Sequence, residues 1–455
     1  MKAARGLAAV ALLWAGPAAA QASPPPPPPA PVTTTAAPPP AEPGPEPEPI
    51  NDSEGYTPPP EGAGAPAPFS INGYVDVGFA KAQGDGTSFA PGDTRVPLDY
   101  GVDGFAPAVN SRGDAASTDP GPGRTVNGFL PRSAGIGGRP SFLLNTLDVD
   151  LKYVAPGAPL TVFSRVQFLP RFIETGGDAT RVYVEQAFGR LVPFDSQEMA
   201  LSVGKFDSVF GIEYLDNQAN IRTGITPSLI ARYTTGQSIG AKLFYRVQIA
   251  PLWSALSLNV AVTNSGNFVE VLQPPDANLT GAPVGSGRLG YELNAAAMQA
   301  KLGVSALYGP RNDQPDRSAR QRELGADLRV AVAGVYLNAE YIRVEEDDGG
   351  PKTTGAGAFP FASGFHARGG YAQLAYALSL DLGPLRKLTV YARYDRRHAW
   401  FEGYTPITVD RITGGVRLDL WEALILKVEY LDNRELAGAP TVANNVFTSS
   451  LVYSW

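Results

Sequence analysis

The sequence predicts an all-β protein: a transmembrane antiparallel β-barrel of about sixteen strands behind a disordered Pro-rich N-terminal segment. Three observations predict this class. Apolar and polar residues alternate over segments of about ten residues, the chain ends on an aromatic residue within such a segment, and short connections alternate with long ones. A soluble secreted β-sandwich or propeller would also alternate, but its strands are usually shorter. Its connections would not sort into two lengths, so the sorting favours the barrel.

The N-terminal residues predict two segments that lie outside the barrel. Residues 1–22 read as a signal peptide, because Lys2 and Arg5 precede a short apolar core followed by small residues. Residues 23–68 carry 19 prolines and six acidic residues without a basic one. Such a segment favours polyproline II and cannot bury enough surface to fold. We expect a disordered periplasmic linker, which either contacts the cell wall or is a spacer with no partner.

Composition excludes several classes of protein. The chain has no cysteine, so disulfide frameworks and thiolate metal sites are excluded. No apolar stretch of about 18 residues follows the N-terminus, which excludes a helical membrane protein. The net charge of −7 becomes −3 for residues 69–455 once Lys2, Arg5 and the six acidic residues of the linker are set aside. A nearly neutral domain does not suggest a nucleic-acid partner.

Residues 69–455 form the predicted barrel domain. Ile239, Leu243 and Val247 illustrate its alternation, since Lys242 and Arg246 fall on the opposite face of the same strand. A strand of about 9 to 11 residues, tilted near 45°, can cross the hydrocarbon layer. The expected strands lie near 70–80, 142–154, 160–170, 181–193, 198–206, 238–249, 256–264, 289–299, 301–308, 322–333, 335–345, 369–378, 388–396, 410–420, 424–431 and 446–455.

The last ten residues are the most typical of an outer-membrane barrel. Phe447, Leu451 and Trp455 share one face of a strand, and Thr448 and Ser450 share the other. A terminal aromatic ring suits the membrane interface. Closure of the barrel would satisfy every strand edge, as lipid requires.

The connections predict the orientation of the barrel. Short turns are expected at 155–159, 250–255, 333–335 and 421–423, and longer polar or Gly-rich loops at 81–141, 171–180, 207–237, 265–288, 309–321, 346–368, 397–409 and 432–445. Short periplasmic turns and long outer loops are the usual asymmetry of outer-membrane barrels. An even strand count then puts both termini in the periplasm, as the linker requires, and the protein in the bacterial outer membrane.

If the apolar faces meet lipid, the opposite faces line the interior. Arg or Lys facing lipid at mid-depth would cost about 2–4 kcal/mol, so the ionised residues are expected inside. Sixteen strands enclose too much space for side chains to fill, which predicts a water-filled channel. The expected channel-lining cations are Lys152, Arg165, Lys242, Arg246, Arg329, Arg393, Arg417 and Lys427, and the expected anions are Asp76, Asp148, Asp150, Glu292, Asp327, Glu340, Asp395, Asp419 and Glu429.

Two interpretations of these charges remain open. They either order ions and small polar solutes in a pore, or merely solvate the wall and pair with one another. Their near balance argues against strong charge selectivity. One long loop is expected to narrow the interior: either 207–237 or the rival loop 81–141. The first has opposed charges for a constriction: Glu213, Asp216, Arg222 and Arg232.

Two motifs resemble a known family. Residues 185–191 (EQAFGRL) and 204–217 (GKFDSVFGIEYLDN) resemble the β-barrel porin-2, OmpL-like family of bacterial outer-membrane proteins, as do residues 391–395 (YARYD) and the final Trp455. The resemblance covers about residues 69–455. It implies a porin for ions and small polar solutes embedded in a lipid bilayer, and names no substrate. A homotrimer is expected only by analogy with porins of this size.

The sequence offers no catalytic, cofactor or metal site. His366 and His398 are the only histidines, and no orienting partner or nucleophile is identified beside them apart from Ser363, which is close in sequence to His366. No Gly-rich loop precedes a helix, so nucleotide binding has no support. We therefore expect a protein that is not an enzyme. The alternative to a channel is a barrel that anchors the surface or cell wall without significant conductance.

Overall fold

The protein is described by a computed structural model, which defines residues 68–82, 141–168, 182–194, 198–207, 209–216, 218–234, 236–250, 254–264, 281–295, 297–311, 318–348, 364–401, 406–436 and 445–455. The predicted signal peptide, nearly all of the predicted linker and the interior of the predicted loop 81–141 lie outside these residues. Their assignments therefore stay predictions.

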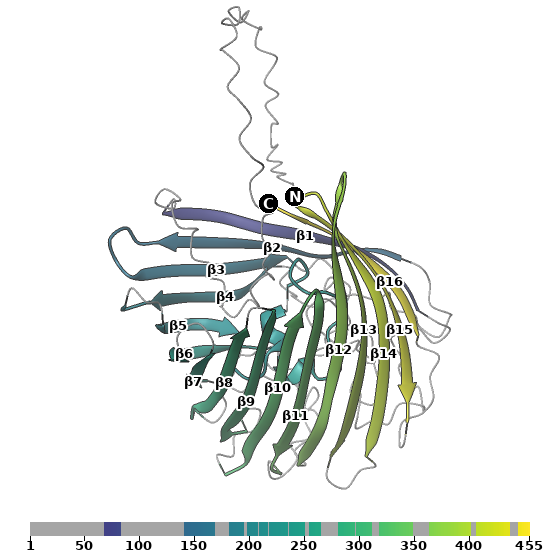
Figure 1. The fold of residues 1–455 in the computed structure, drawn as a ribbon. Coiled ribbons are helices and arrows are strands. Elements are labelled where there is room, and N and C mark those ends of the chain that lie inside the picture. The colour runs from purple at the N-terminus through teal and green to yellow at the C-terminus, as the bar shows by residue number, and fades with distance from the viewer. Residues whose placement is uncertain are drawn as a thin grey trace, which may run out of the picture. The chain divides into compact units, whose positions relative to one another are not determined.

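Sixteen antiparallel strands form one closed barrel (Figure 1). Each strand pairs with its neighbours in sequence, and β1 closes the ring against β16. The strands are β1 (Phe69–Ala82), β2 (Ser141–Val154), β3 (Leu160–Phe168), β4 (Val182–Leu191), β5 (Met199–Asp207), β6 (Gln237–Ala250), β7 (Ser254–Thr263), β8 (Val284–Ala295), β9 (Met298–Pro310), β10 (Arg320–Val332), β11 (Val335–Glu346), β12 (Phe365–Leu382), β13 (Leu385–Phe401), β14 (Ile407–Leu420), β15 (Leu424–Glu435) and β16 (Val446–Ser454). The predicted fold class is confirmed.

The alternation of apolar and polar residues along each strand corresponds to the outer and inner faces of the barrel. Along β7, Leu256 and Val260 are exposed on the outside, whereas Ser257 and Asn259 are buried. Strand β16 behaves in the same way, and the backbone N–H and C=O of Trp455 both pair with Gly73 on β1, at 3.1 and 3.2 Å. The terminal aromatic segment therefore closes the barrel, as its sequence predicts.

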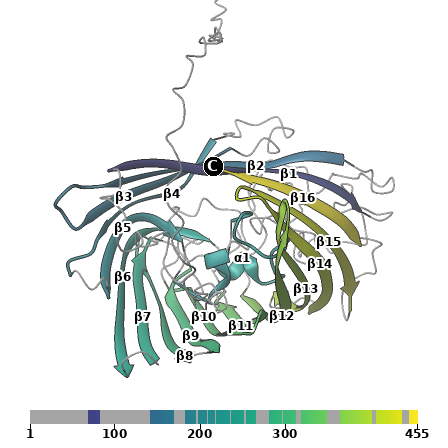
Figure 2. The same ribbon diagram turned by 45° about the horizontal axis from the view of Figure 1, so that its top comes forward.

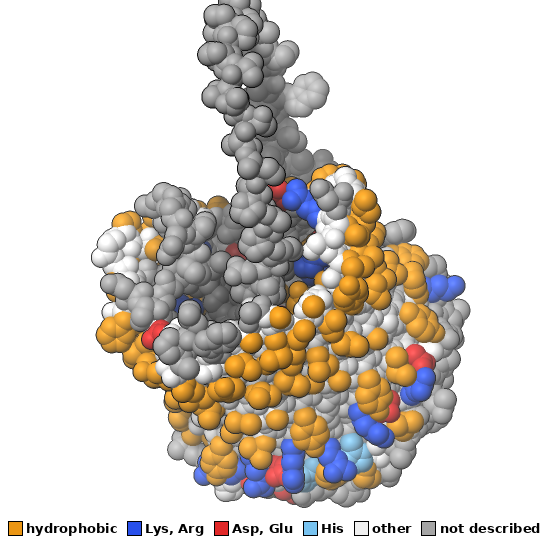
Figure 3. All heavy atoms as spheres, viewed as in Figure 1, with side chains coloured by type: hydrophobic (Ala, Val, Ile, Leu, Met, Phe, Trp, Pro, Cys, Tyr) orange, Lys and Arg blue, Asp and Glu red, His pale blue; other side chains and the backbone are white. Residues whose placement is uncertain are grey.

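Apolar side chains cover the outside of the barrel (Figure 3). Many of the exposed aromatics lie toward the two ends of the strands, as membrane interfaces favour. Examples are Phe168, Tyr308 and Phe447 at the long-connection end, and Phe69, Tyr153, Tyr376, Trp421 and Tyr453 at the short-turn end, whereas Tyr341, Tyr394 and Tyr430 lie nearer the middle of their strands. Among the described residues, no helix has the length and hydropathy needed to span a membrane.

The predicted short turns at 155–159, 333–335 and 421–423 are confirmed, whereas part of the predicted turn 250–255 lies outside the described residues. Several predicted strand boundaries are wrong. The turn after β10 uses Ala333 and Gly334, both with positive φ (46° and 82°), as a two-residue hairpin between right-twisted strands requires. The predicted strand 289–299 runs across a turn, because β8 ends at Ala295 and β9 begins at Met298. The alanines around this turn carry no polar–apolar contrast, which explains the shifted boundary.

Candidate functional site: an inward segment on a charged wall

The connection between β5 and β6 folds into the barrel. We call its residues 209–234, without residue 217, the inward segment. It contains the 3₁₀ turn η3 (Glu213–Asp216) and the short helix α1 (Ala231–Thr234), and α1 lies within the ring of strands (Figure 2). Its hydrogen bonds reach strands far away in sequence: β1, β9, β10, β11, β13, β14 and β15. The prediction that loop 207–237 enters the interior agrees with these contacts.

Strands β9 to β11 hold the start of the inward segment. The backbone N–H groups of Ile212 and Glu213 each donate to the Glu340 carboxylate at 3.2 Å. The N–H of Gly211 donates to the Ser305 hydroxyl at 3.0 Å. Gly211 has φ of 74°, and a Cβ there would come within 1.8 Å of Glu340 Oε1. This position therefore requires glycine for both conformation and close approach.

Arg329 on β10 completes this attachment. Its guanidinium donates to the Ile212 carbonyl and to the Asp216 carboxylate, each at 2.8 Å. The Arg329 side chain is only 6% exposed, whereas that of Asp216 is 29% exposed. Of this pair, Asp216 is the member that water can reach.

A lysine on β15 binds three carbonyl groups of the inward segment. The Lys427 ammonium donates to the carbonyls of Ala219, Arg222 and Gly224 at 2.5, 2.5 and 2.9 Å. An ammonium has three donors, and all three are used. Lys427 is 1% exposed. It therefore acts on the segment, and solutes cannot reach it in this conformation.

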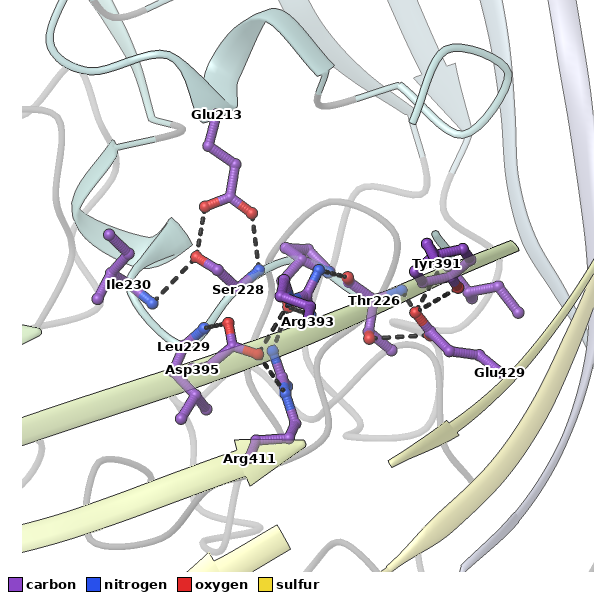
Figure 4. A network of polar contacts seen from close by, with 12 residues as sticks. Glu213, Thr226, Ser228, Leu229, Ile230, Tyr391, Arg393, Asp395, Arg411 and Glu429 are labelled. Carbon is purple, nitrogen blue, oxygen red and sulfur yellow. Dashed lines mark hydrogen bonds and ion pairs between the residues drawn. The ribbon is translucent and has the colours of Figure 1, made fainter. Parts of the chain in front are cut away.

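Two residues on, Glu429 has the complementary role (Figure 4). Its carboxylate accepts hydrogen bonds from the N–H of Ile225 at 3.3 Å and from the N–H and hydroxyl of Thr226, both at 2.9 Å. The Tyr391 hydroxyl on β13 donates to it at 2.8 Å. One strand thus presents a cation to backbone carbonyls and an anion to backbone N–H groups, as a polar chain folded out of water needs.

A third cluster joins β13 and β14 to the same stretch (Figure 4). Arg393 donates to the carbonyls of Thr226 and Pro227, each at 2.8 Å. Arg411 also donates to the Pro227 carbonyl. Asp395 lies between them: it accepts from Arg393 at 2.9 Å and from the N–H of Leu229 at 3.2 Å. The cluster is buried, and its two guanidinium groups share one carboxylate. The carbonyl groups of the inward segment accept the further guanidinium hydrogen bonds.

The charges predicted for the constriction are used mainly within the inward segment. Glu213 accepts from the N–H of Ser228 at 2.7 Å and from its hydroxyl. Arg222 donates to the carbonyls of Asp216 and Ile225 at 3.1 and 3.4 Å. Burial lowers the pKa of Arg222, and the nearby Glu213 carboxylate opposes that shift. The side chain of Arg232 lies outside the described residues.

The opposite wall is organised by pairs of side chains. Arg165 on β3 binds Asp150 on β2 through two bonds of 2.6 and 2.8 Å. Arg246 on β6 donates to Glu292 on β8 at 3.0 Å. The exposed fractions of the Asp150 and Arg246 side chains are 23% and 26%. These groups are within reach of solvent.

The pair of Arg288 on β8 and Asp327 on β10 crosses an intervening strand. The two residues form bonds of 2.6 and 2.8 Å over Gly303 on β9. A Cβ at Gly303 would lie 2.4 Å from the Arg288 guanidinium and 2.5 Å from the Asp327 carboxylate. The glycine therefore makes room for this ion pair on the inner face.

The remaining predicted channel residues also lie on the inner face. Lys242 is 4% exposed and is packed over the rings of Phe206 and Phe188, with centroid distances of 4.7 and 5.9 Å. Arg417 binds Asp419 at 2.7 Å and the carbonyls of the inward segment, and both side chains keep some exposure (15% and 19%). Others are placed as follows: Asp76 accepts from Ser450 at 2.6 Å, Asp148 from Thr146 at 2.9 Å, and Lys152 is half-buried.

Several inner charges are not predicted from the sequence. The predicted strand begins at residue 289, which leaves Arg288 in a loop, whereas β8 begins at Val284. Arg411 is in the predicted strand 410–420, and its alternation with Thr413 was the available signal. Glu185 lies where the β3–β4 register shifts, and Asp207 is the last residue of β5. The alternation of inward and outward residues therefore could not place either side chain.

The described residues show no catalytic constellation. His366 on β12 stacks on Trp400 at 4.8 Å, and His398 on β13 is bonded to the Thr408 hydroxyl at 2.7 Å. Both histidines point outward, because they alternate with buried inner residues such as Ala367 and Ala399. In the part of the chain that the structure describes, no group of three or more acidic or histidine side chains could hold a metal ion.

Comparisons with known proteins give a distant likeness in structure. No family model and no curated protein matches the chain, so the resemblance to the OmpL-like family is not confirmed. Three similar solved structures each correspond to 85% of this chain. They are the outer-membrane channel DcaP of Acinetobacter baumannii (12% identity, 97% of that chain, TM-score 0.48), the trimer form of OmpT, an outer membrane protein of Vibrio cholerae (10%, 99%, 0.47), and an anion-selective porin from Comamonas acidovorans (9%, 99%, 0.45). Identity and TM-score are both low, so function is inferred below from the geometry of this chain.

Proposed function

We propose that this protein is an outer-membrane porin: a water-filled channel for passive diffusion of ions and small polar solutes, with weak charge selectivity. The observation that carries the proposal is the inverted polarity of the barrel. Its outer face is apolar, with Leu324, Val304 and Leu374 between 56% and 60% exposed, while ionised side chains occupy the inner face. Such a molecule fits lipid outside and water inside.

The solvent-exposed inner charges indicate where solutes would pass. Asp150, Arg246 and Arg288 are between 12% and 26% exposed on the wall from β2 to β8. On β13 and β15, Arg393, Asp395 and Lys427 are between 0% and 3% exposed, because the inward segment covers them. On β14, Arg417 and Asp419 keep exposed fractions of 15% and 19% near the short-turn end, but they are paired with each other. We therefore place the aqueous path beside β2–β8, with Asp216 of the inward segment facing it. This arrangement makes the inward segment the constriction.

Weak selectivity is supported by the pairing of the exposed inner charges. Arg246 has Glu292, Arg288 has Asp327, and Asp150 has Arg165. A paired charge presents a dipole, so neither ion sign is strongly favoured.

Location and assembly belong to the same proposal. The short-turn end would face the periplasm, with both termini and the Pro-rich linker, and the long connections would face outward. A homotrimer is proposed for this barrel, as is membership of the OmpL-like porin family; native mass spectrometry in detergent tests the trimer. A contact between the linker and the cell wall also stays a proposal.

Planar-bilayer recording of the purified mature chain tests the channel. We expect stable open-channel steps and, across a salt gradient, a reversal potential close to zero. A silent bilayer would overturn the channel and favour the anchoring barrel. A reversal potential near that of an ideally selective pore would overturn weak selectivity alone. Solubility of the mature chain without detergent would contradict the membrane location itself.

A further inference from the structure

The outer face of the barrel carries a groove that the channel does not use. It is about 800 Å³ in volume and lies over β10 to β14, on the lipid-facing side. Its floor is made of small outward residues, including Ala326, Ala339, Gly370 and Ala372. Tyr341 is the register partner of Gly370, and Tyr394 is the partner of Ala372. The two tyrosine rings therefore flank the small residues Gly370 and Ala372 on β12. The volume of the groove falls in the range of ligand pockets.

One end of this groove is cationic. Arg368, Arg396 and His398 line it at the end toward the long connections. Cross-strand register places Arg343, Arg368 and His398 side by side on β11, β12 and β13. Figure 3 shows basic, acidic and histidine side chains gathered along this edge, below the apolar belt.

The charges at this edge are only partly neutralised. Arg396 has Asp410 at 3.4 Å, and Arg343 pairs with Glu345. Arg368 is exposed and has no carboxylate partner among the described residues. An unpaired Arg on the lipid face is costly at mid-depth, and this cost falls almost to zero near the interface. Arg368 therefore belongs at headgroup depth, where an anion can meet it.

We propose that this groove binds a phosphorylated, multiply acylated glycolipid of the outer leaflet, of the lipid A type. An acyl chain would lie over Gly370 and Ala372 between the two tyrosines, and phosphate would accept from Arg368 and Arg396. Adjacent strands are about 4.8 Å apart, so the row from Arg343 to His398 spans about 10 Å. One phosphate needs fewer donors than this row offers, whereas a disaccharide headgroup with two phosphates matches its width.

The inference rests on the proposed outer-membrane location, and it is independent of conductance. Arg368, Arg396 and Ala372 point outward and touch none of the inner-wall contacts described above. Their variants are expected to conduct like the unmodified protein. Loss of channel steps with lipid binding retained would count against the porin alone, and the reverse result would count against the lipid site alone.

The charge test compares the two ends of the β12–β13 hairpin. Native mass spectrometry of the full chain in detergent, titrated with purified lipid A, should show binding weakened about tenfold or more by Arg368→Ala with Arg396→Ala, since charge-assisted bonds to phosphate are lost. Arg386→Ala is the matched control, because Arg386 lies on β13 at the short-turn end, where it is exposed and paired with Glu422. Equal losses in both variants would overturn the site.

The groove test leaves every charge in place. Ala372→Leu fills the floor and is expected to weaken lipid A binding several-fold. Ala392→Leu makes the same change one row deeper on the outer face, outside the groove, and should have no effect. Unchanged binding in Ala372→Leu would show that the acyl chain does not lie there, and would overturn the proposed pose.

The source of the phosphate is tested by competition. Cardiolipin and phosphatidylglycerol should displace lipid A poorly, and lipid A without its phosphates should bind weakly. Equal competition by either phospholipid would overturn the glycolipid assignment in favour of a general anionic lipid site.

Discussion

The two halves of the inner wall use the same residue types for different purposes. On β13 to β15, Arg393, Lys427 and Glu429 bind backbone groups of the inward segment, and they are buried. On β6 to β8, Arg246 and Glu292 bind each other, and Arg246 keeps contact with solvent. The difference follows from what faces each wall: a folded backbone needs donors and acceptors, whereas water supplies its own. Of these residues, Arg246 is therefore the one that can act on a permeating ion.

The largest expected effect comes from releasing the inward segment. Glu429→Ala removes the acceptor for Ile225, Thr226 and Tyr391, and leaves buried donors that cost about 1–3 kcal/mol each. The segment should detach from β15, and single-channel recordings should show a larger conductance with more frequent transitions. Glu292→Ala is the control, because Glu292 binds Arg246 on the other wall. Equal conductance in Glu429→Ala and the unmodified protein would show that Glu429 does not hold the inward segment in place.

A smaller effect is expected from the wall that faces water. Arg246→Glu reverses a 26%-exposed charge and places it beside Glu292. In water, one unit charge about 4 Å from an ion contributes about 1 kcal/mol, so this two-unit change shifts the energy of the ion by about 2 kcal/mol, or about thirtyfold in its partitioning. Reversal potentials in a salt gradient should shift toward cations.

The matched control for this change is Arg386→Glu. It makes the same charge reversal on the outer face at the short-turn end, beside Glu422. It should leave the reversal potential unchanged. If both variants shift the potential equally, Arg246 acts only through the overall field of the protein and does not line the path.

Sequence alternation predicted the faces of the strands better than their ends. On β12 and β13, the inward–outward order continues through His366, Arg368 and His398, beyond the predicted limits at 369–378 and 388–396. Toward the long connections the polarity reverses, because His366, Arg368 and His398 face outward while Phe365, Ala367 and Ala399 are buried inside. The rule that apolar residues face outward therefore no longer marks the strand, although the hydrogen bonding continues. The groove edge is built from these residues, so it could not be predicted from the alternation.

The partners of the inner charges could not be predicted from the sequence. The alternation along β15 puts Lys427 and Glu429 on the inner face, but it does not show whether water or protein contacts these side chains. That depends on the path of the β5–β6 connection, whose backbone conformation is set by contacts distant in sequence. Gly211 is the local signal that could have helped, since its close approach to Glu340 requires a residue without a side chain.

The smallest expected effect tests how tightly the start of the inward segment is seated. Gly211→Ala places a Cβ against Glu340 in a left-handed conformation, at a cost of about 1–2 kcal/mol. Glu340 must move, which weakens its bonds to Ile212 and Glu213, while the attachment at β13–β15 persists. Noise in the open state should therefore increase without the larger conductance expected for Glu429→Ala. Gly414→Ala, where a Cβ meets nothing within 4 Å on the outer face, should leave the open state as quiet as in the unmodified protein. A full increase in conductance from Gly211→Ala would mean that β9–β11, and not β13–β15, keep the segment in place.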